Sequence, residues 1–263
     1  MRELKFSYRQ NIGFEHPVNN HIFSYRCLPK TEPRQEIIDL KIDLSPCDFW
    51  AYGVDGFKNR TVYGSMKEIH DHFFLEVSGR ARIDWQIYDQ DDINNSLYEL
   101  QTKFTQPGPA MHSCMEYIEP FVNTKIKDYG KACELMDWIH EFFAYEKGIT
   151  GTHTTAEQAF QLGRGVCQDY AHVMIGMCRH FHIPARYVSG AMIGEGYSHA
   201  WVEIFSDGKW YGFDPTNHLL VDDMYIVFSR GRDCKDCVIN RGTYWGMAGS
   251  ETQKINVLVE EIK

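Results

Sequence analysis

Alternating hydrophobic and polar residues dominate the first third of the chain. Apolar side chains occupy every second position in two runs, namely Leu4, Phe6 and Tyr8, and Ile38, Leu40, Ile42 and Leu44. This period of two is typical of strands that bury one face. Turn-forming clusters separate such runs, at Asn19-Asn20, Pro29 to Pro33, Ser45-Pro46, Asp55-Gly56 and Ser78-Gly79. The pattern predicts that residues 1 to about 88 form an antiparallel sheet of the β-sandwich type.

The alternation fades between residues 89 and 113. Asp89-Gln90-Asp91-Asp92 and Pro107-Gly108-Pro109 have the composition of a linker. A chain of 263 residues is also longer than one small core requires. We therefore expect an N-terminal β domain over residues 1–100 and a second domain over residues 101–263.

From residue 114 the hydrophobic period is that of a helix. The apolar positions spaced at i, i+3 and i+4 are Ala132, Leu135, Met136, Ile139, Phe142 and Phe143. They predict a helix that ends near Lys147-Gly148. A capping box from Thr155 to Gln158 predicts a short helix that Gly163 ends.

A second helical stripe runs from Val166 to Phe181 and predicts a helix that ends before Ile183-Pro184. Arg186 to Ser189 fits a strand, and the glycine-rich stretch Gly190 to Tyr197 fits a mobile loop. Helices followed by short strands make this second domain α+β.

Composition is that of a globular protein, with 43% hydrophobic and 24% charged residues. A net charge of −9 without a long basic run argues against nucleic acid or an anionic membrane as a partner. The sequence has no bilayer-length apolar run and no secretion signal behind Met1, so we expect a cytoplasmic protein. Its eight cysteines are then expected to be reduced.

Cys167 stands where a small-residue turn meets a predicted helix. The run Gly163-Arg164-Gly165-Val166 places it near the first helical position. Free backbone N–H groups and the helix dipole stabilise a thiolate there, and the same groups can hold an oxyanion. A buried structural cysteine is the more frequent interpretation of any single cysteine, so the position alone does not decide the role.

A predicted hairpin brings His199 and Asp214 to one sheet face. Residues 198–205 alternate, and Asp207-Gly208 predicts a two-residue turn before a second strand over residues 210–214. If Ser206 pairs with Lys209, then Trp201 lies opposite Asp214 and His199 is its diagonal neighbour. Their backbones are then roughly 7–8 Å apart, which an imidazole and a carboxylate can bridge. A one-residue bulge would break this pairing.

With Cys167 these residues have the chemistry of a nucleophile, a general base and an orienting carboxylate. The blocks GRGVCQDYAHVMIGMCRHFHIPARYVSG, SHAWVEIF, GKWYGFDPTN and SRGRD resemble the bacterial transglutaminase-like proteins of the papain-like cysteine-enzyme superfamily. The resemblance covers about residues 115–245. Residues 1–88 are similar, more loosely, to the N-terminal domain often joined to this core.

The resemblance implies a papain-like α+β core, a catalytic triad of Cys167, His199 and Asp214, and acyl transfer or amide hydrolysis through a thioester without metal. Family members often carry an aromatic and a proline-containing segment after the GRD motif. This chain has Arg232-Asp233-Cys234-Lys235-Asp236-Cys237 there, so the rim of the pocket is not predicted.

Three neighbouring residues are secondary candidates. Gln161 lies six positions before Cys167, the offset of the oxyanion glutamine in papain-like enzymes, although a glutamine on a helix surface is the plainer interpretation. Trp201 is expected to shield the His–Asp pair, to form a pocket wall or simply to pack in the sheet. Asp169 falls in the first turn of the Cys167 helix, where the dipole favours a carboxylate.

Cys234-x-x-Cys237 is half of a zinc site, which His180-x-His182 could complete. One such pair is weak evidence, with free thiols or a redox-sensitive pair as alternatives. We expect no metal and no other cofactor.

Together these features predict a cysteine protease or amidase that acts on a carboxamide or peptide bond of a peptide or protein substrate. Water is the expected acceptor. An amine acceptor would make the protein a protein-glutamine γ-glutamyltransferase, and a non-catalytic binding module that keeps the fold is a third alternative. The residues leave the substrate, the acceptor and the oligomeric state open.

Overall fold

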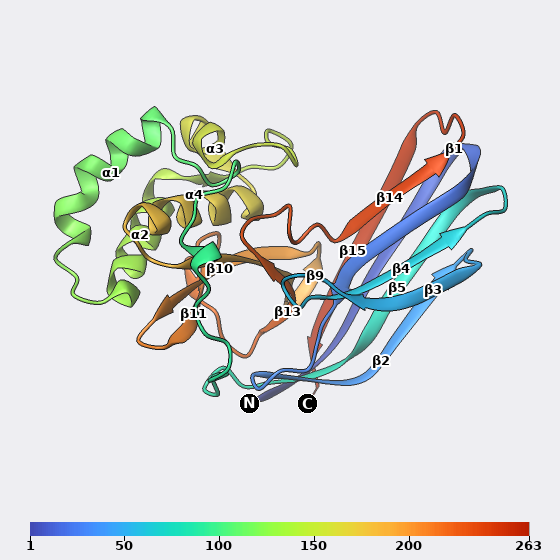
Figure 1. Cartoon of the computed structure of the whole chain (residues 1–263), viewed down its shortest axis with the longest axis horizontal. Coiled ribbons are helices and arrows are strands. Elements are labelled where there is room, and N and C mark those ends of the chain that lie inside the picture. Colours follow the sequence, from blue (N-terminus) through green and yellow to red (C-terminus); the bar gives the residue numbers. More distant parts are fainter. Residues whose placement is uncertain (263) are drawn as a thin grey trace.

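The N-terminal third of the chain consists of antiparallel strands, as predicted (Figure 1). The structure is a computed structural model that describes residues 1–262. Its first five strands are β1 (Arg2–Leu28), β2 (Gln35–Ser45), β3 (Phe49–Val54), β4 (Arg60–Met66) and β5 (His70–Ile83). Leu4, Phe6 and Tyr8 are buried, which confirms the alternation expected for this face.

The long strand β1 belongs to both layers of this domain. Its first part pairs with β5 and its later part with β4. The turn expected at Asn19-Asn20 is therefore wrong, because both residues lie inside one bent strand. Asn20 has a φ of 46°, a conformation that asparagine tolerates, so the strand changes direction without ending. Phe23 then packs on Phe73 with 4.8 Å between ring centroids, so the domain has a sandwich-like core.

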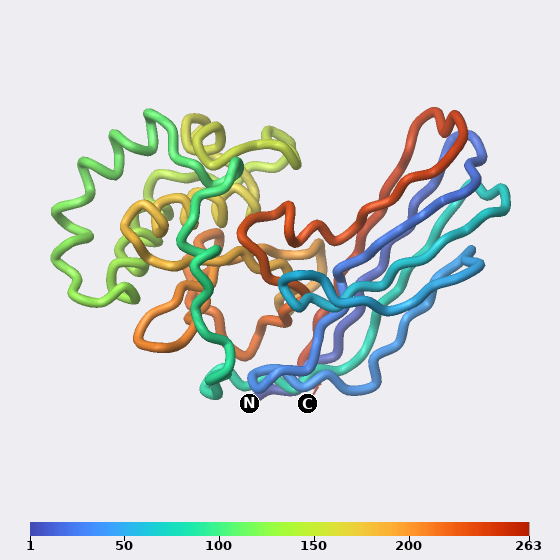
Figure 2. Tube along the Cα trace, in the orientation of Figure 1, coloured from blue at the N-terminus to red at the C-terminus, as the bar shows by residue number. Residues whose placement is uncertain are grey.

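The C-terminal strands return to the N-terminal sheet (Figure 2). β14 (Asn240–Trp245) and β15 (Glu251–Glu261) pair with the two parts of β1, and Tyr8 lies opposite Val257. Assigning every residue after 100 to the second domain is therefore wrong for these two strands. Their partners in β1 lie more than 200 residues away along the chain, and no local pattern specifies such a pairing.

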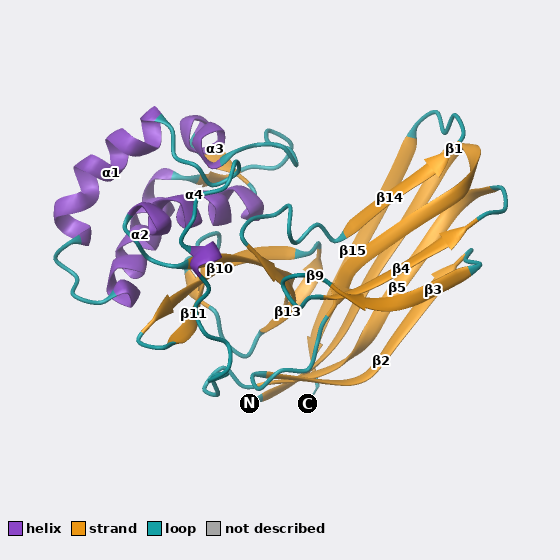
Figure 3. Ribbon diagram, viewed as in Figure 1, coloured by secondary structure: helices purple, strands orange, loops and turns teal. Residues whose placement is uncertain are grey.

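The second domain packs helices on an antiparallel sheet (Figure 3). Its helices are α1 (Pro109–Val122), α2 (Asp128–Phe142), α3 (Ala156–Leu162) and α4 (Cys167–His180), preceded by the short helix η1 (Ser96–Tyr98). The sheet runs in the order β12 (Leu219–Leu220), β11 (Lys209–Asp214), β10 (His199–Ser206), β8 (Ala185–Met192) and β13 (Tyr225–Gly231). No helix within residues 1–262 is long and apolar enough to cross a membrane.

The core sheet uses its two faces differently. Ala200, Val202 and Ile204 of β10 pack against the helices. On the other face, Phe228 of β13 meets Tyr8 of the N-terminal domain with ring centroids 6.3 Å apart. Both faces of the sheet are thus covered, one by helices and one partly by the N-terminal domain.

Helix α2 ends at Phe142 and not near Gly148 as predicted. Phe143 is extended, and the next residues form β6 (Ala144–Tyr145), which pairs in parallel with β7 (Arg164–Gly165). The Phe143 carbonyl also accepts a hydrogen bond from the Tyr170 hydroxyl of α4 at 2.8 Å. These tertiary contacts outweigh the local preference for a longer helix.

The stretch Gly190 to Tyr197 is not the free loop that its glycines suggested. Its first residues continue β8, and Gly194–Gly196 form a short strand, β9, that pairs with β15. Val257 lies opposite Gly196 in this pairing. The segment just before His199 is therefore tied to the N-terminal sheet.

Two side-chain amides of the N-terminal domain pair with the edge of β13 that no strand of the core sheet covers. Gln35 exchanges hydrogen bonds with the backbone N–H and carbonyl of Val227, at 2.8 and 3.0 Å. Asn59 does the same with Arg230, with both distances 2.8 Å. Each amide thus substitutes for a neighbouring strand and satisfies an edge that would otherwise be left unpaired.

A buried ion network crosses the same junction. The Glu203 carboxylate, fully buried on β10, contacts Arg186 of β8 at 2.6 Å and Arg230 of β13 at 2.8 Å. Arg230 also pairs with Glu32 of the N-terminal domain, and Arg186 with Asp92 of the linker. Every charge has a partner, which is the condition for burying it.

Replacing Glu203 with alanine should therefore destabilise the whole protein. The change leaves Arg186 and Arg230 buried without their shared carboxylate, and breaking a buried pair in this way costs about 3–5 kcal/mol. Urea unfolding would measure the loss. Glu36→Ala, which removes the exposed partner of Arg82, is the matched control and should change little. Equal effects of the two variants would contradict a structural role for the buried network.

Candidate active site

Cys167 is the first residue of α4, as predicted, and its side chain is half-buried. Gly163 ends α3 with a φ of 62°, and Gly165 leaves no room for a Cβ, which would lie 2.5 Å from the Asp169 carboxylate. That carboxylate accepts hydrogen bonds from the Val166 N–H at 2.8 Å and from the Thr150 hydroxyl at 2.6 Å. Asp169 thus caps the helix that presents Cys167.

The hairpin has the predicted register. Asp207 and Gly208 have φ values of 49° and 80°, as a two-residue turn of this kind requires, and Ser206 pairs with Lys209. No bulge interrupts the pairing between there and Val202. Consequently His199 Nε2 lies 2.7 Å from Asp214 Oδ2, and the expected His–Asp pair is confirmed.

Asp214 is fully buried and accepts several other hydrogen bonds. Its Oδ2 atom accepts from the Tyr225 hydroxyl at 2.9 Å and from Asn217 Nδ2 at 2.7 Å. Its Oδ1 atom accepts from the backbone N–H groups of Thr216 and Asn217, at 3.1 and 3.2 Å. Burial raises the pKa of Asp214, but these donors and the charge of His199 outweigh it and lower the pKa overall.

The structure also brings Cys167 to His199. Both residues line one cavity of about 410 Å³, together with Tyr145, Tyr197 and Asn217. Because Nε2 of His199 faces Asp214, the other ring nitrogen, Nδ1, is left for the thiol. Burial lowers the pKa of His199, but hydrogen bonds and charges from Asp214 and Cys167 raise it to about 10. His199 is therefore placed to carry a positive charge next to the Cys167 sulfur.

Two secondary candidates do not line this cavity. Gln161 is exposed on α3 and donates a hydrogen bond to Glu157 of the same helix at 2.9 Å, so the structure gives no support to an oxyanion role. Trp201 is fully buried and cannot form a pocket wall. Its ring stacks on His199 with 6.2 Å between centroids, which matches the shielding alternative. Gly190 permits this stacking, because a Cβ there would lie 2.5 Å from the indole.

Sequence reasoning missed Tyr145, Asn217 and Tyr225. The position of Asn217 was predictable from the sequence. In a common type of turn, an aspartate side chain accepts hydrogen bonds from backbone N–H groups two and three residues later, and the run Asp214-Pro-Thr-Asn217 fits this turn. Tyr225 comes from β13 and Tyr145 from the two-residue strand β6, and neither placement has a local signal.

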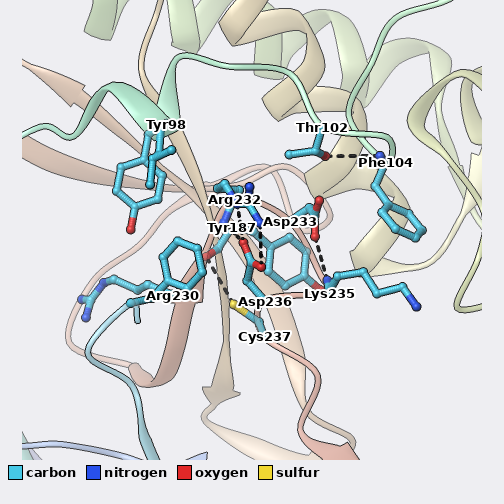
Figure 4. Close-up of polar contacts among 12 residues, drawn as sticks. Tyr98, Thr102, Phe104, Tyr187, Arg230, Arg232, Asp233, Lys235, Asp236 and Cys237 are labelled. Atoms are coloured by element: carbon cyan, nitrogen blue, oxygen red, sulfur yellow. Dashed lines mark hydrogen bonds and ion pairs between the residues drawn. The ribbon is translucent and has the colours of Figure 1, made fainter. Parts of the chain in front are cut away.

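The segment after the GRD motif forms a tight loop (Figure 4). Asp236 turns back to accept from the Arg232 side chain at 2.8 Å, and Cys237 Sγ donates to the Tyr187 carbonyl at 3.9 Å. Burial raises the pKa of the Cys234 thiol to about 12. Within residues 1–262 no three His, Cys, Asp or Glu side chains are grouped to hold a metal ion, so the half zinc site is not completed.

Comparison with known proteins agrees with this architecture. The profile of the transglutaminase-like superfamily matches residues 116–215, and that of the bacterial transglutaminase-like N-terminal region matches residues 4–82. The first of these matches contains all three residues of the expected triad. The chain belongs to the transglutaminase-like superfamily, with a bacterial transglutaminase-like N-terminal region.

Similar chains span nearly the whole protein. The uncharacterised protein ML0607 of Mycobacterium leprae is 27% identical, over 99% of this chain and 98% of its own. The uncharacterised protein Mb2599c of Mycobacterium bovis is 29% identical, over 89% and 84%. Among solved structures, a candidate cysteine protease from Cytophaga hutchinsonii has a TM-score of 0.79 at 20% identity, covering 100% of this chain and 92% of its own. At that identity the likeness shows a shared fold.

The raised pKa of His199 predicts that its ring loses the second proton only at high pH. The ring should keep its second proton up to a pH of about 10, and Cys167→Ala should lower this pKa because a hydrogen bond and a negative charge are lost. The proton's contribution to stability is complete below the ordinary pKa of 6.5 and is lost as the pH rises through about 10. Imidazole NMR shifts would follow the titration. Cys114→Ala, remote on α1, is the control, and a ring that titrates identically in both variants would contradict the pairing with Cys167.

Proposed function

We propose that this protein is a cysteine amidase or peptidase whose nucleophile is Cys167. The 2.7 Å hydrogen bond between His199 and Asp214, at the wall of the cavity that Cys167 shares, is the observation that carries the proposal. A thiolate at a helix N-terminus beside an imidazolium is the arrangement that acyl transfer to sulfur requires. The superfamily and the fold of the Cytophaga hutchinsonii protein support the same class of chemistry.

In the first half-reaction the Cys167 thiolate attacks the carbonyl carbon of an amide. A tetrahedral oxyanion forms, and His199 gives its Nδ1 proton to the leaving amine as the C–N bond breaks. A thioester remains on Cys167. Asp214 keeps the ring oriented throughout, because its hydrogen bond occupies Nε2.

In the second half-reaction water attacks the thioester, and His199 takes up a proton from that water. The carboxylic acid leaves, and the thiolate–imidazolium pair is restored. We propose water as the acceptor because exposed side chains such as Tyr145 and Tyr197 line the cavity and leave the thioester accessible to solvent. Peptide or protein substrates and a cytoplasmic location remain part of the proposal.

The oxyanion has two candidate donors. One is the backbone N–H of Cys167, which meets no acceptor within residues 1–262. The other is the Tyr145 hydroxyl, from the same cavity. Partial burial and the negative charge of Cys167 raise the pKa of Tyr145, so the hydroxyl keeps its proton and can donate it to an oxyanion. Tyr145 thus takes the role that the sequence suggested for Gln161.

Cys167→Ala should abolish turnover and leave the fold intact, because the half-buried side chain is at a helix start and not in the core. Circular dichroism and hydrolysis of a peptide library would test both parts. In the native protein, iodoacetamide at pH 7 should label Cys167 ahead of Cys114 and Cys133, since burial raises the pKa of those two thiols. Full activity of Cys167→Ala would refute the assignment.

Tyr145→Phe should lower kcat about 100-fold with little change in KM, the usual effect of removing one oxyanion donor. Tyr117→Phe on α1 is the matched control, because that hydroxyl is exposed far from Cys167 along the chain and does not line the cavity. Equal kcat in the two variants would exclude the Tyr145 hydroxyl as a donor.

Acid quenching during turnover, followed by mass spectrometry, would locate the acyl group. An acyl adduct on the Cys167 peptide supports the thioester. Adding methylamine then separates the two acceptors, since hydrolysis yields a carboxylic acid and transamidation yields an N-methyl amide. A dominant N-methyl amide at millimolar amine would favour the γ-glutamyltransferase alternative that the superfamily's name suggests.

A further inference from the structure

A second and larger cavity lies beside the first. It has a volume of about 600 Å³ and is walled by the N-terminal domain on one side and by the core on the other. Gln168, which follows Cys167, and Ser198, which precedes His199, both line it. Ser198 lines the smaller cavity as well, so the two cavities adjoin at the residue before His199. A substrate chain attacked by Cys167 could thus continue into this space.

The charges at this cavity have one sign. Lys235 and Arg241 are the charged residues that line it, and no aspartate or glutamate among residues 1–262 does. The chain as a whole has a net charge of −9, so this is a local reversal. Arg241 is held in place by a hydrogen bond from its guanidinium to the backbone carbonyl of Lys235.

Two aspartates flank Lys235 in sequence but do not neutralise the cavity. Asp236 is occupied by the Arg232 side chain, through contacts of 2.8 and 3.1 Å. Asp233 is buried and accepts the backbone N–H of Lys235 at 2.8 Å. Figure 4 shows the Lys235 side chain extending away from Asp236. The Lys235 ammonium lies 5.7 Å from the centroid of the Phe104 ring. No carboxylate within residues 1–262 forms a salt bridge with it, so it can still pair with an anion of a ligand.

Another part of the cavity wall is polar and neutral. Gln10 of β1 is fully buried in a strand face that is otherwise apolar. It accepts a hydrogen bond from the Tyr8 hydroxyl at 3.3 Å and donates one to Gln253 of β15 at 3.0 Å. All three residues line the cavity. These hydrogen bonds satisfy the buried amide of Gln10, and a polar, neutral wall suits a peptide backbone.

We propose that this cavity is a substrate subsite that binds a carboxylate next to the attacked amide, with Lys235 and Arg241 as its counter-charges and the N-terminal sheet as its wall. The carboxylate comes either from an acidic side chain or from a peptide C-terminus. The inference rests on the proposed function for its placement next to Cys167. Charge-assisted hydrogen bonds from an ammonium and a guanidinium favour carboxylates over neutral amides.

Binding to a Cys167→Ala background tests the subsite without turnover. Isothermal titration calorimetry would use acetylated, amidated hexapeptides with a central glutamine and one Glu, Gln or Lys at each other position in turn. At one position, the peptide with Glu should bind about tenfold or more tightly than the peptide with Gln, and the peptide with Lys should have the lowest affinity. A second series with free C-termini shows whether a terminal carboxylate is preferred instead. Raising the salt concentration should reduce the preference.

Lys235→Gln combined with Arg241→Gln should abolish the preference. Lys254→Gln is the matched control, because Gln253 and Ile255 line the cavity and the residue between them points to the other face of β15. Equal affinity for Glu and Gln peptides in both series, or a preference that survives the double variant, would overturn the subsite. Absence of any acyl-enzyme in the native protein would instead contradict the proposed reaction, so the two failures are distinguishable.

Discussion

The buried carboxylate of Asp214 requires hydrogen-bond donors, and the residues around it supply them. A charge without exposure to water requires several donors, and Asp214 receives them from His199, Asn217, Tyr225 and its own turn. Tyr225 belongs to β13 and the others to β10 and the turn after β11. The hydrogen bond that orients His199 therefore depends on three separate segments of the chain. The buried ring of Trp201 stacks on the His199 ring and shields that side of it from water.

This requirement extends to the N-terminal domain. β13 is an edge strand of the core sheet, and the amides of Gln35 and Asn59 satisfy its free backbone groups. The strand that carries Tyr225 is thus held from both sides, by β8 and by these amides. β9, just before His199, is paired with β15 in the same way. The N-terminal domain consequently acts on the site through backbone pairing, and its sheet also walls the larger cavity.

The proposed reacting groups and the proposed recognition groups come from different parts of the molecule. Cys167 and His199 lie on rigid elements of the core, a helix start and a strand, which suits groups that need fixed geometry. Lys235 and Arg241 lie in the loop and strand that lead back to the N-terminal sheet. Such a division lets specificity change without disturbing the chemistry.

Local patterns in the sequence determined much of this protein. Alternation predicted the strands of the first domain, helical spacing predicted α4 with Cys167 at its start, and the Asp207-Gly208 turn predicted the contact between His199 and Asp214, because turn type sets register in a short hairpin. Tertiary structure alone decided the return of β14 and β15 to β1, the placement of Tyr145 and Tyr225, the separation of Gln161 from the site, and the meeting of Cys167 with His199. Each of these depends on packing between segments distant in the chain, where the free energy lies in burial and long-range pairing that no local pattern encodes.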